Sequence, residues 1–288
     1  MAKSAVRSRT VNVDGIRTHY LEAGEGPTVV FLHSGEFGGC AEISWEFNLD
    51  AFARHFRCVA PDWLGFGRTD KVFDFADGRT RSLEHMRRFL EVMDIREADF
   101  IGNSMGGSNL ARIAAARPVI FPIRSLVLCP GGGFAPASEA RAKLLAYDGT
   151  PAAMRELLDG MFFDKRKWVD NPAYIRRRQK YALIPGAWEC TSAPRLKRPN
   201  QKTAGQFGSP DSTPYENIEV PVLLVAGKYD ELREKGYAPK LGKRMGATVK
   251  VYDKAGHCPH IEHAARFNRD AIAFLKGVHR KLGVKRAG

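Results

Sequence analysis

The sequence has 288 residues, of which 44% are hydrophobic and 27% charged, a composition that is ordinary for a globular enzyme with a substantial buried core. No apolar run reaches the length of a membrane span, and the basic N-terminus is not followed by the apolar stretch of a secretory signal, so we expect a cytoplasmic protein with no membrane partner. The formal net charge is +13, yet the sequence carries no helix-turn-helix, zinc-finger or RNA-binding signature, which argues against nucleic acid and favours an anionic small substrate.

Most of the chain alternates between expected strands and expected helices. Residues 8–22 suit two short strands joined by the turn Asp14-Gly15. Buried strands are expected at the apolar runs that follow: 28–33, 57–60, the run ending at Gly102, 124–129, 221–226 and 247–252. Helices are expected where apolar residues repeat at helical spacing: 45–56, 83–93, the alanine-rich segment after residue 104, and 264–282. This alternation predicts an α/β fold, a mostly parallel sheet with helices on both faces.

Residues 134–213 interrupt the alternation. They hold seven prolines and two segments with helical spacing, 154–163 and 174–183, but no convincing core strand. We interpret them as a helical lid inserted between two parts of the core, 1–133 and 214–288. The stretch 192–212 is rich in Pro, Lys, Arg, Gly and Gln and is expected to be a mobile return connection.

The chain is organised around Gly102-Asn103-Ser104-Met105-Gly106, which joins an apolar run to an alanine-rich helical pattern. A strand, Gly-x-Ser-x-Gly and a helix in this order are typical of a nucleophile elbow, a tight and strained turn. Glycine suits positions 102 and 106, because side chains there would collide as strand and helix close on each other. The turn should expose the Ser104 hydroxyl and place the Met105 N–H at the helix N-terminus, where it can donate to an oxyanion.

A serine hydroxyl needs a base to act as a nucleophile, and the base needs a carboxylate to orient it. Of the eight histidines, His257 is best placed, because it follows an expected strand and comes directly after Gly256. Asp230 follows the preceding expected strand in the same way. Since the order Ser, Asp, His is the one found with this elbow, we predict Ser104, Asp230 and His257 as the catalytic residues.

The other polar candidates have plainer interpretations. His19, His55 and His85 are expected at the surface. His33 is expected to support the loop that follows it through hydrogen bonds. Asp62 lies in a Pro-Asp-x-x-Gly turn, where a structural role is more common than catalysis.

An oxyanion hole needs a second N–H donor besides Met105. In this kind of fold it comes from the loop after the third strand, which here begins Ser34-Gly35-Glu36. Gly35 is our candidate, and the sequence leaves its two neighbours open.

Together these motifs resemble the α/β-hydrolase superfamily over the whole chain and, within it, the meta-cleavage-product hydrolases. That family cleaves a carbon–carbon bond in vinylogous 1,5-diketones formed during aromatic-ring degradation. The resemblance is carried by these segments: 102–107, 60–70, 262–268 and, in the expected lid, 161–164 and 178–186.

The resemblance implies a serine hydrolase acting on a 2-hydroxy-6-oxo-dienoate. It assigns Arg178 to the anionic end of the substrate and Asn103 to a further substrate contact. The residues alone say only that one of Arg176, Arg177 and Arg178 can point fully inward at helical spacing.

The sequence departs from the family pattern in two places. The usual loop His-Gly-x-Gly-Pro-Gly is replaced by His-Ser-Gly-Glu-Phe-Gly-Gly at 33–39, and the tryptophan that often follows the catalytic histidine is Cys258. Both changes reshape the pocket, and they make Ser34 and Glu36 candidate substrate contacts.

Two other functions stay open. One is an ester, lactone or amide hydrolase with the same triad, and the other is a non-hydrolytic pocket protein, either a cofactor-free oxygenase or a receptor. No dinucleotide, phosphate-loop or metal-ligand pattern is present, so we expect no cofactor and no metal. The expected partner is an anionic, partly aromatic small molecule, and members of the family often form homo-oligomers.

Overall fold

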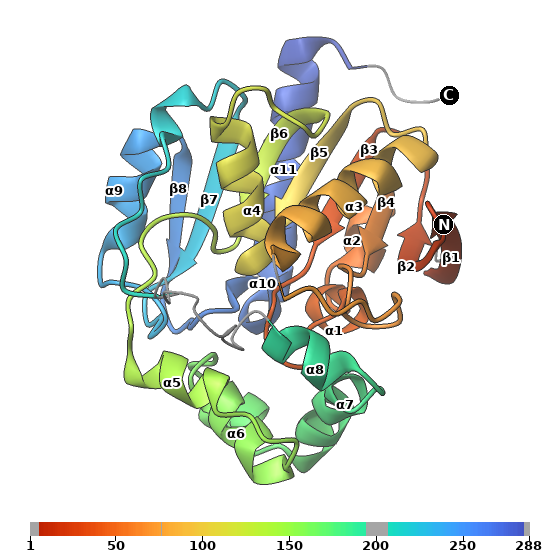
Figure 1. Ribbon diagram of the computed structural model, residues 1–288. Coiled ribbons are helices and arrows are strands. Elements are labelled where there is room, and N and C mark those ends of the chain that lie inside the picture. The colour runs from red at the N-terminus through yellow and green to blue at the C-terminus, as the bar shows by residue number, and fades with distance from the viewer. Residues whose placement is uncertain (1–5, 76, 194–206, 285–288) are drawn as a thin grey trace.

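The computed structural model describes residues 6–75, 77–193 and 207–284. At its centre is an eight-stranded sheet in the order β1-β2-β4-β3-β5-β6-β7-β8 (Figure 1). The strands are β1 (Arg7–Val13), β2 (Ile16–Ala23), β3 (Thr28–Leu32), β4 (Arg57–Pro61), β5 (Ala98–Gly102), β6 (Ile123–Leu128), β7 (Val222–Gly227) and β8 (Thr248–Tyr252). The expected strands are therefore all found.

Only the first two strands run antiparallel to their neighbours. β1 and β2 form the expected hairpin, and β2 pairs antiparallel with β4. From β4 to β8 every pair is parallel. The carboxyl ends of these strands therefore meet at one edge of the sheet, where α/β proteins place their binding sites.

Helices cover both faces of the sheet, as predicted. One face is covered by α1 (Ala41–Trp45), α2 (Leu49–Phe52) and α11 (Ala264–Leu282), and the other by α3 (Gly78–Val92), α4 (Met105–Ala115) and α9 (Tyr237–Arg244) (Figure 1). Each face has its own apolar core. Trp45 and Phe52 pack edge-on against Phe31 of β3 on the first face, and Phe89 and Leu110 belong to the core of the second.

Two helix predictions need correction. Of the single helix expected over 45–56, only α2 (Leu49–Phe52) and the last residue of α1 are helical, and between them the buried Asn48 donates from its side chain to the backbone carbonyl of His260 and to the side-chain oxygen of Asn268. Helix α9 was not predicted at all, since its short sequence carries a proline and a glycine that weaken the helical pattern.

Further helices lie between β6 and β7 and gather beside the sheet edge (Figure 1). These inserted helices are α5 (Glu139–Leu145), α6 (Pro151–Asp159), the π-helix η1 (Lys165–Val169), α7 (Pro172–Ala182) and α8 (Ala187–Ser192). They share an apolar cluster of their own, which includes Met154, Phe162 and Trp168 and reaches the core through Cys258 and Ile261. The division at 134 and 213 stays a prediction, and most of the expected return connection, 194–206, lies outside the described residues.

Local sequence explains why these helices begin where they do. At α6 the Thr150 side chain accepts a hydrogen bond from the Ala153 N–H, and at α7 the Asn171 side chain accepts from the next two free N–H groups. Both helices then start with proline, whose missing N–H costs nothing at this position. Two further short helices are η3 (Tyr215–Asn217) and α10 (Pro259–Glu262).

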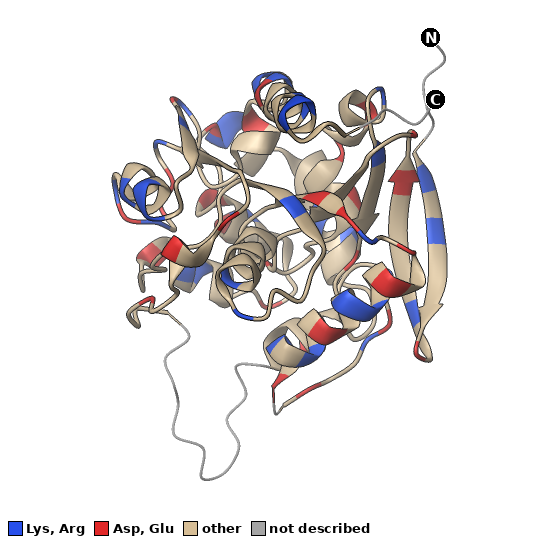
Figure 2. Cartoon of the chain, turned by 90° about the horizontal axis from the view of Figure 1, so that it is seen from above, with Lys and Arg blue, Asp and Glu red and all other residues tan. Residues whose placement is uncertain are grey.

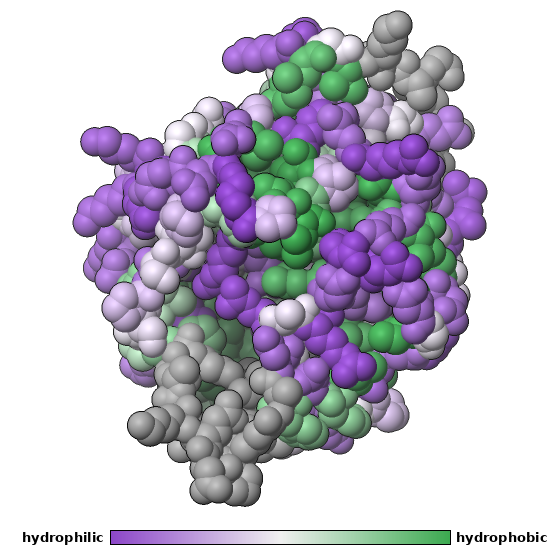
Figure 3. Space-filling model, turned by 45° about the horizontal axis from the view of Figure 1, so that its top comes forward, coloured by the Kyte–Doolittle hydropathy of each residue, from purple (hydrophilic) through white to green (hydrophobic). Residues whose placement is uncertain are grey.

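The positive charge is spread over many elements and interleaved with acidic residues rather than gathered on one face (Figure 2). The upper front of the molecule is mostly hydrophilic, with apolar side chains collected in part of it (Figure 3). Across the described ranges, no helix combines the length and the apolar character needed to cross a membrane.

Candidate active site

Ser104 occupies the turn between β5 and α4 with φ of 51° and ψ of −108°, a strained conformation for a residue other than glycine. The turn has no room for side chains at its two glycines. A Cβ on Gly102 would lie 2.6 Å from the Gly107 nitrogen, and one on Gly106 would lie 2.2 Å from the Leu32 carbonyl oxygen. The strained serine is thus fixed by close contacts of α4 with both β5 and β3.

The structure brings together the three residues predicted as catalytic. His257 Nε2 lies 2.8 Å from Ser104 Oγ, and His257 Nδ1 lies 2.9 Å from each carboxylate oxygen of Asp230. The three side chains come from the segments that follow β5, β7 and β8, so the parallel strands deliver them to one edge of the sheet. If Nδ1–H donates to the carboxylate, Nε2 is free to accept the serine proton.

Asp230 is held as a carboxylate although its side chain is buried. Burial acts to raise its pKa, but the charge and hydrogen bond of His257 and the charge of Arg233 outweigh it, and the pKa of Asp230 lies below its ordinary value. The Leu232 N–H adds a hydrogen bond of 2.9 Å to the same carboxylate. An ionised Asp230 keeps the imidazole in one tautomer and one orientation.

We expect this carboxylate to make stability depend on pH in the acid range. Because the pKa of Asp230 is lower in the folded chain than the ordinary value of 3.8, the unfolded chain binds the proton more readily, and stability falls as pH drops below that value. Thermal unfolding of the wild type from pH 6 to pH 3 should show the fall, and Asp230→Asn should show a shallower one. Identical slopes for the two proteins would contradict the assignment.

The predicted oxyanion donors lie close together. A Cβ on Gly35 would lie 2.6 Å from the Met105 sulfur, so the loop after β3 contacts the elbow. Within the described residues, no acceptor is found for the N–H of Gly35 or of Met105, which leaves both available to a ligand. His33 supports this loop as predicted: its Nε2 accepts from the Trp63 N–H at 3.0 Å, and its Nδ1 lies 2.6 Å from the Ser34 carbonyl oxygen.

A cavity of about 420 Å³ opens beside these groups. Its wall includes Ser104, Met105, His257, Gly35 and Glu36. Apolar side chains of the inserted helices, among them those of α5, complete part of the wall. The nucleophile, its base and the two residues that carry the candidate oxyanion donors thus line one cavity.

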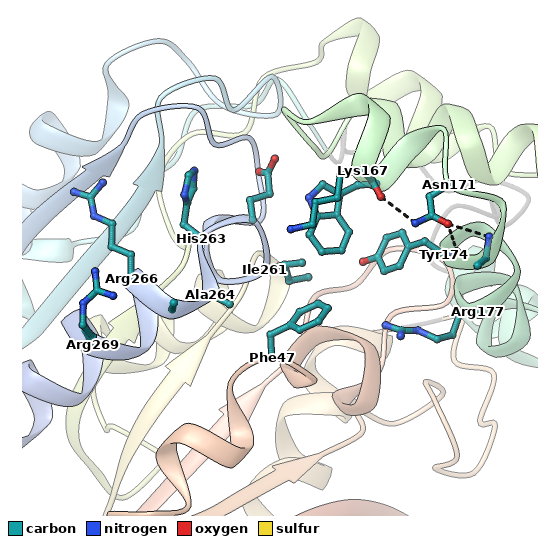
Figure 4. Close-up of a pocket in the computed structure, with 14 residues that line it drawn as sticks. Phe47, Lys167, Asn171, Tyr174, Arg177, Ile261, His263, Ala264, Arg266 and Arg269 are labelled. Carbon is teal, nitrogen blue, oxygen red and sulfur yellow. Dashed lines mark hydrogen bonds between the residues drawn. The ribbon is translucent and has the colours of Figure 1, made fainter.

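A larger cavity of about 820 Å³ lies elsewhere, between the segment of η1 and α7 and the segment of α10 and α11 (Figure 4). Phe47, Tyr174 and Ile261 contribute to it, together with several cationic side chains. None of the predicted catalytic residues lines it. The smaller cavity is therefore the candidate active site, because it is lined by predicted catalytic residues and the larger cavity is not.

Arg178 does not have the surroundings that its predicted role requires. It is the inward-pointing member of its arginine run, but its side chain is only 1% exposed, its Nη1 donates to Glu36 Oε1 at 2.6 Å, and it does not line the cavity. Burial acts to raise the pKa of Glu36, but the Arg178 guanidinium outweighs it and holds that pKa below its ordinary value. The positive charge of Arg178, which was predicted to bind the substrate, is paired with the carboxylate of Glu36.

Two other predicted substrate contacts also lie outside the cavity wall. Asn103 is buried, and its amide donates to the Cys129 carbonyl at 2.5 Å, so it ties the elbow to the segment after β6. Ser34 is buried as well, and its hydroxyl is among the groups that keep the pKa of Glu36 below its ordinary value. Neither lines the cavity, whereas Glu36 does.

Sequence reasoning missed the arginines of the cavity wall. Arg141 and Arg233 line the cavity on the side of α5 and of the segment after β7. The position of Arg233, three residues after Asp230, was the one signal in the sequence that it could lie near the triad. No motif marks Arg141. Across the described ranges, no cluster of three or more His, Cys, Asp or Glu side chains is arranged to hold a metal ion.

Comparisons with known proteins agree with this geometry. The family model described as "Alpha/beta hydrolase family" matches residues 29–271. A 2-hydroxy-6-oxo-6-(2'-aminophenyl)hexa-2,4-dienoic acid hydrolase of Metapseudomonas resinovorans is 30% identical over 99% of this chain and 96% of its own. A 2-hydroxymuconate semialdehyde hydrolase of Pseudomonas sp. (strain CF600) is 29% identical over 90% of each chain. Among solved structures, a variant of the meta-cleavage product hydrolase CumD is 25% identical with a TM-score of 0.82, covering 93% of this chain and 98% of its own.

Proposed function

The chain belongs to the alpha/beta hydrolase family and, within it, to the meta-cleavage-product hydrolases, and from this premise we propose that it cleaves a carbon–carbon bond in a 2-hydroxy-6-oxo-dienoate. It is an enzyme and a hydrolase. We propose Ser104 as the nucleophile, His257 as its base and Asp230 as the residue that orients the base. The observation that carries the proposal is the 2.8 Å contact of Ser104 Oγ with His257 Nε2.

In the proposed reaction the dienol first shifts to its keto form. Ser104 Oγ then adds to the distal ketone while its proton passes to His257, and the Met105 and Gly35 N–H groups stabilise the oxyanion. When the carbon–carbon bond breaks, its electron pair stays with the departing dienoate fragment, which takes the proton from His257. Water, deprotonated by His257, then attacks the acyl-serine and releases a carboxylic acid. One water is consumed and the enzyme is regenerated.

An ester or lactone hydrolase is the second candidate, and one observation favours it. Arg178 is neutralised by Glu36, so the family's expected partner for a dienoate carboxylate is engaged within the protein. The same serine, base and oxyanion donors would serve an ester without change.

A substrate panel separates the two candidates. Dienoates are coloured and should bleach on mixing with the enzyme, so kcat/KM can be compared directly with that for aryl esters of similar size. We expect the dienoates to have the higher kcat/KM. Turnover of esters alone would instead support the second candidate. Turnover of neither, with no labelling of Ser104 by an active-serine probe, would support the non-hydrolytic pocket protein.

We make three further proposals, on the lid, the substrate and the location of the enzyme. We propose that residues 134–213 act as the lid, because Met161 accepts a hydrogen bond of 2.7 Å from the His257 N–H and so joins this segment to the triad. We propose a small, aromatic-derived substrate, as the names of the relatives indicate for those proteins. We propose that the enzyme works in the cytoplasm.

A further inference from the structure

The wall of the candidate active site carries far more positive than negative charge. Five arginines line it: Arg79, Arg81, Arg112, Arg141 and Arg233. Among the described residues only Arg81 has a carboxylate within salt-bridge distance, Asp74 at 3.6 Å. The sequence outside the described ranges contains no Asp or Glu at all, so no further carboxylate side chain exists there to pair with the other four.

Two of these arginines lie close to the triad. Arg141 donates from Nε to the Pro136 carbonyl at 3.0 Å and from Nη2 to the Leu232 carbonyl at 2.8 Å, which leaves Nη1 with no hydrogen bond among the described residues. Its guanidinium also lies 4.2 Å from the centre of the Phe207 ring. Backbone carbonyls and an aromatic face hold this cation in place without cancelling its charge.

Arg233 is held in a similar way. It donates to the Gly132 carbonyl at 2.8 Å and lies 3.4 Å from the hydroxyl of Ser108. Ser108 is one helical turn beyond Ser104 on α4, so this cation is a near neighbour of the nucleophile. Asp230 is the carboxylate that offsets the charge of both arginines, but its oxygens are already bonded to His257.

The other two unpaired arginines line the cavity further from the nucleophile. Ser104, Ser108 and Arg112 are four residues apart and share one face of α4, which places Arg112 about 12 Å along the helix from Ser104. Arg79 comes from α3 and lies near enough to Arg112 for the two charges to interact. The cavity therefore runs from the triad toward a second pair of cations.

Two of these cations lower the pKa of a neighbouring one. Burial and the neighbouring Arg233 lower the pKa of Arg141 to about 10, and burial and the neighbouring Arg112 lower the pKa of Arg79. Asp230 and Asp77 offset these charges only in part, and like charges held close together are an unfavourable arrangement, which a bound anion would relieve. The pair of Glu36 and Arg178 has no net charge, so it does not need a bound anion to balance it.

We propose that a negatively charged group of the substrate is bound by Arg141, with Arg233, Arg112 and Arg79 supplying the surrounding positive charge. The ligand class is a carboxylate whose reacting carbonyl lies at Ser104. The inference rests on the proposed function only in that placement of the carbonyl.

A pair of esters that differ in one charge tests the proposal. Mono-p-nitrophenyl adipate carries a free carboxylate, whereas p-nitrophenyl hexanoate has the same number of acyl carbons and none. We expect the wild type to prefer the adipate, and Arg141→Met to lose about 10- to 100-fold in kcat/KM for the adipate with little change for the hexanoate. Arg112→Met should lose less. The neutral ester controls for misfolding, since a disturbed site would slow both esters alike.

The matched control is Arg176→Met, which removes one positive charge from an exposed position on α7. It should leave the preference unchanged, which separates local binding from the effect of net charge. A preference that survives in Arg141→Met and Arg112→Met overturns the proposal. So does an equal loss for both esters in those two variants.

Binding can be measured even if no ester is hydrolysed. Calorimetric titration of Ser104→Ala with adipate should show binding that the added Arg141→Met change weakens by a similar factor. If the wild type proves inactive but this difference is found, the proposed function fails and the present inference stands. Absence of adipate binding to Ser104→Ala overturns the inference, whatever the activity.

Discussion

Replacing Ser104 with alanine is expected to lower kcat by about a millionfold, the loss seen when a serine nucleophile is removed from a working triad. The reason is geometric. In the part of the chain that the structure describes, Ser104 Oγ is the side-chain oxygen that hydrogen-bonds to His257 Nε2, at 2.8 Å, and it lies at the start of α4 beside the candidate oxyanion donors. The measurement is single-turnover bleaching of a coloured dienoate by wild type and variant.

The variant should still bind the dienoate, because the substitution removes one oxygen and leaves the cavity wall in place. A spectral shift of the dienoate on mixing would report this binding. Ser108→Ala is a matched control: it changes the next serine on the same face of α4, which has no bond to His257, and should cost far less activity. Comparable activity in wild type and Ser104→Ala would remove Ser104 as the nucleophile.

The arrangement around Ser104 could be predicted from sequence because local rules determine it. A Gly-x-Ser-x-Gly segment between a strand and a helix leaves few backbone paths, and residues that follow parallel strands must gather at one edge of the sheet. The last helix was predicted with the observed limits, Ala264–Leu282, because its apolar residues repeat at helical spacing within one continuous segment. These features depend on neighbours in the sequence.

The partners of buried polar groups could not be predicted in this way. His19 and His85 were expected at the surface, but both are buried: His19 bonds to Asp62 at 2.7 Å and His85 bonds to Thr18 at 2.9 Å. His55 is exposed, as expected. A polar residue looks the same in sequence whether it faces water or a partner dozens of positions away, and only the folded chain distinguishes the two.

The pair of Glu36 and Arg178 is the most consequential example. The two residues are 142 positions apart, one in the loop after β3 and one on α7. The resemblance to the family assigned a role to Arg178. At residue 36, however, this chain departs from the family pattern and carries the glutamate that pairs with Arg178. The match covered only one member of the pair, so it could not show that a carboxylate of the same chain contacts the Arg178 guanidinium.

Removing one member of that pair is expected to have a large effect on stability. Glu36→Ala should lower the free energy of unfolding by about 3–5 kcal/mol, because it leaves the Arg178 charge buried without its partner. Both side chains are almost fully enclosed, at 1% and 3% exposure, and Arg178 does not line the cavity, so water entering the space left by Glu36 would solvate the guanidinium far less than bulk water does. Urea unfolding followed by circular dichroism would measure the change.

Removing both charges should cost much less than removing one. The double variant Glu36→Leu/Arg178→Met leaves no isolated charge in the interior, and apolar replacements of a buried ion pair are often close to neutral. Arg177→Met is the control, because it breaks the neighbouring but half-exposed pair with Glu46 and should cost about 1 kcal/mol or less. If Glu36→Ala unfolds at the same urea concentration as the wild type, the charge of Arg178 finds another partner, and the argument that Glu36 withholds it from the substrate fails with it.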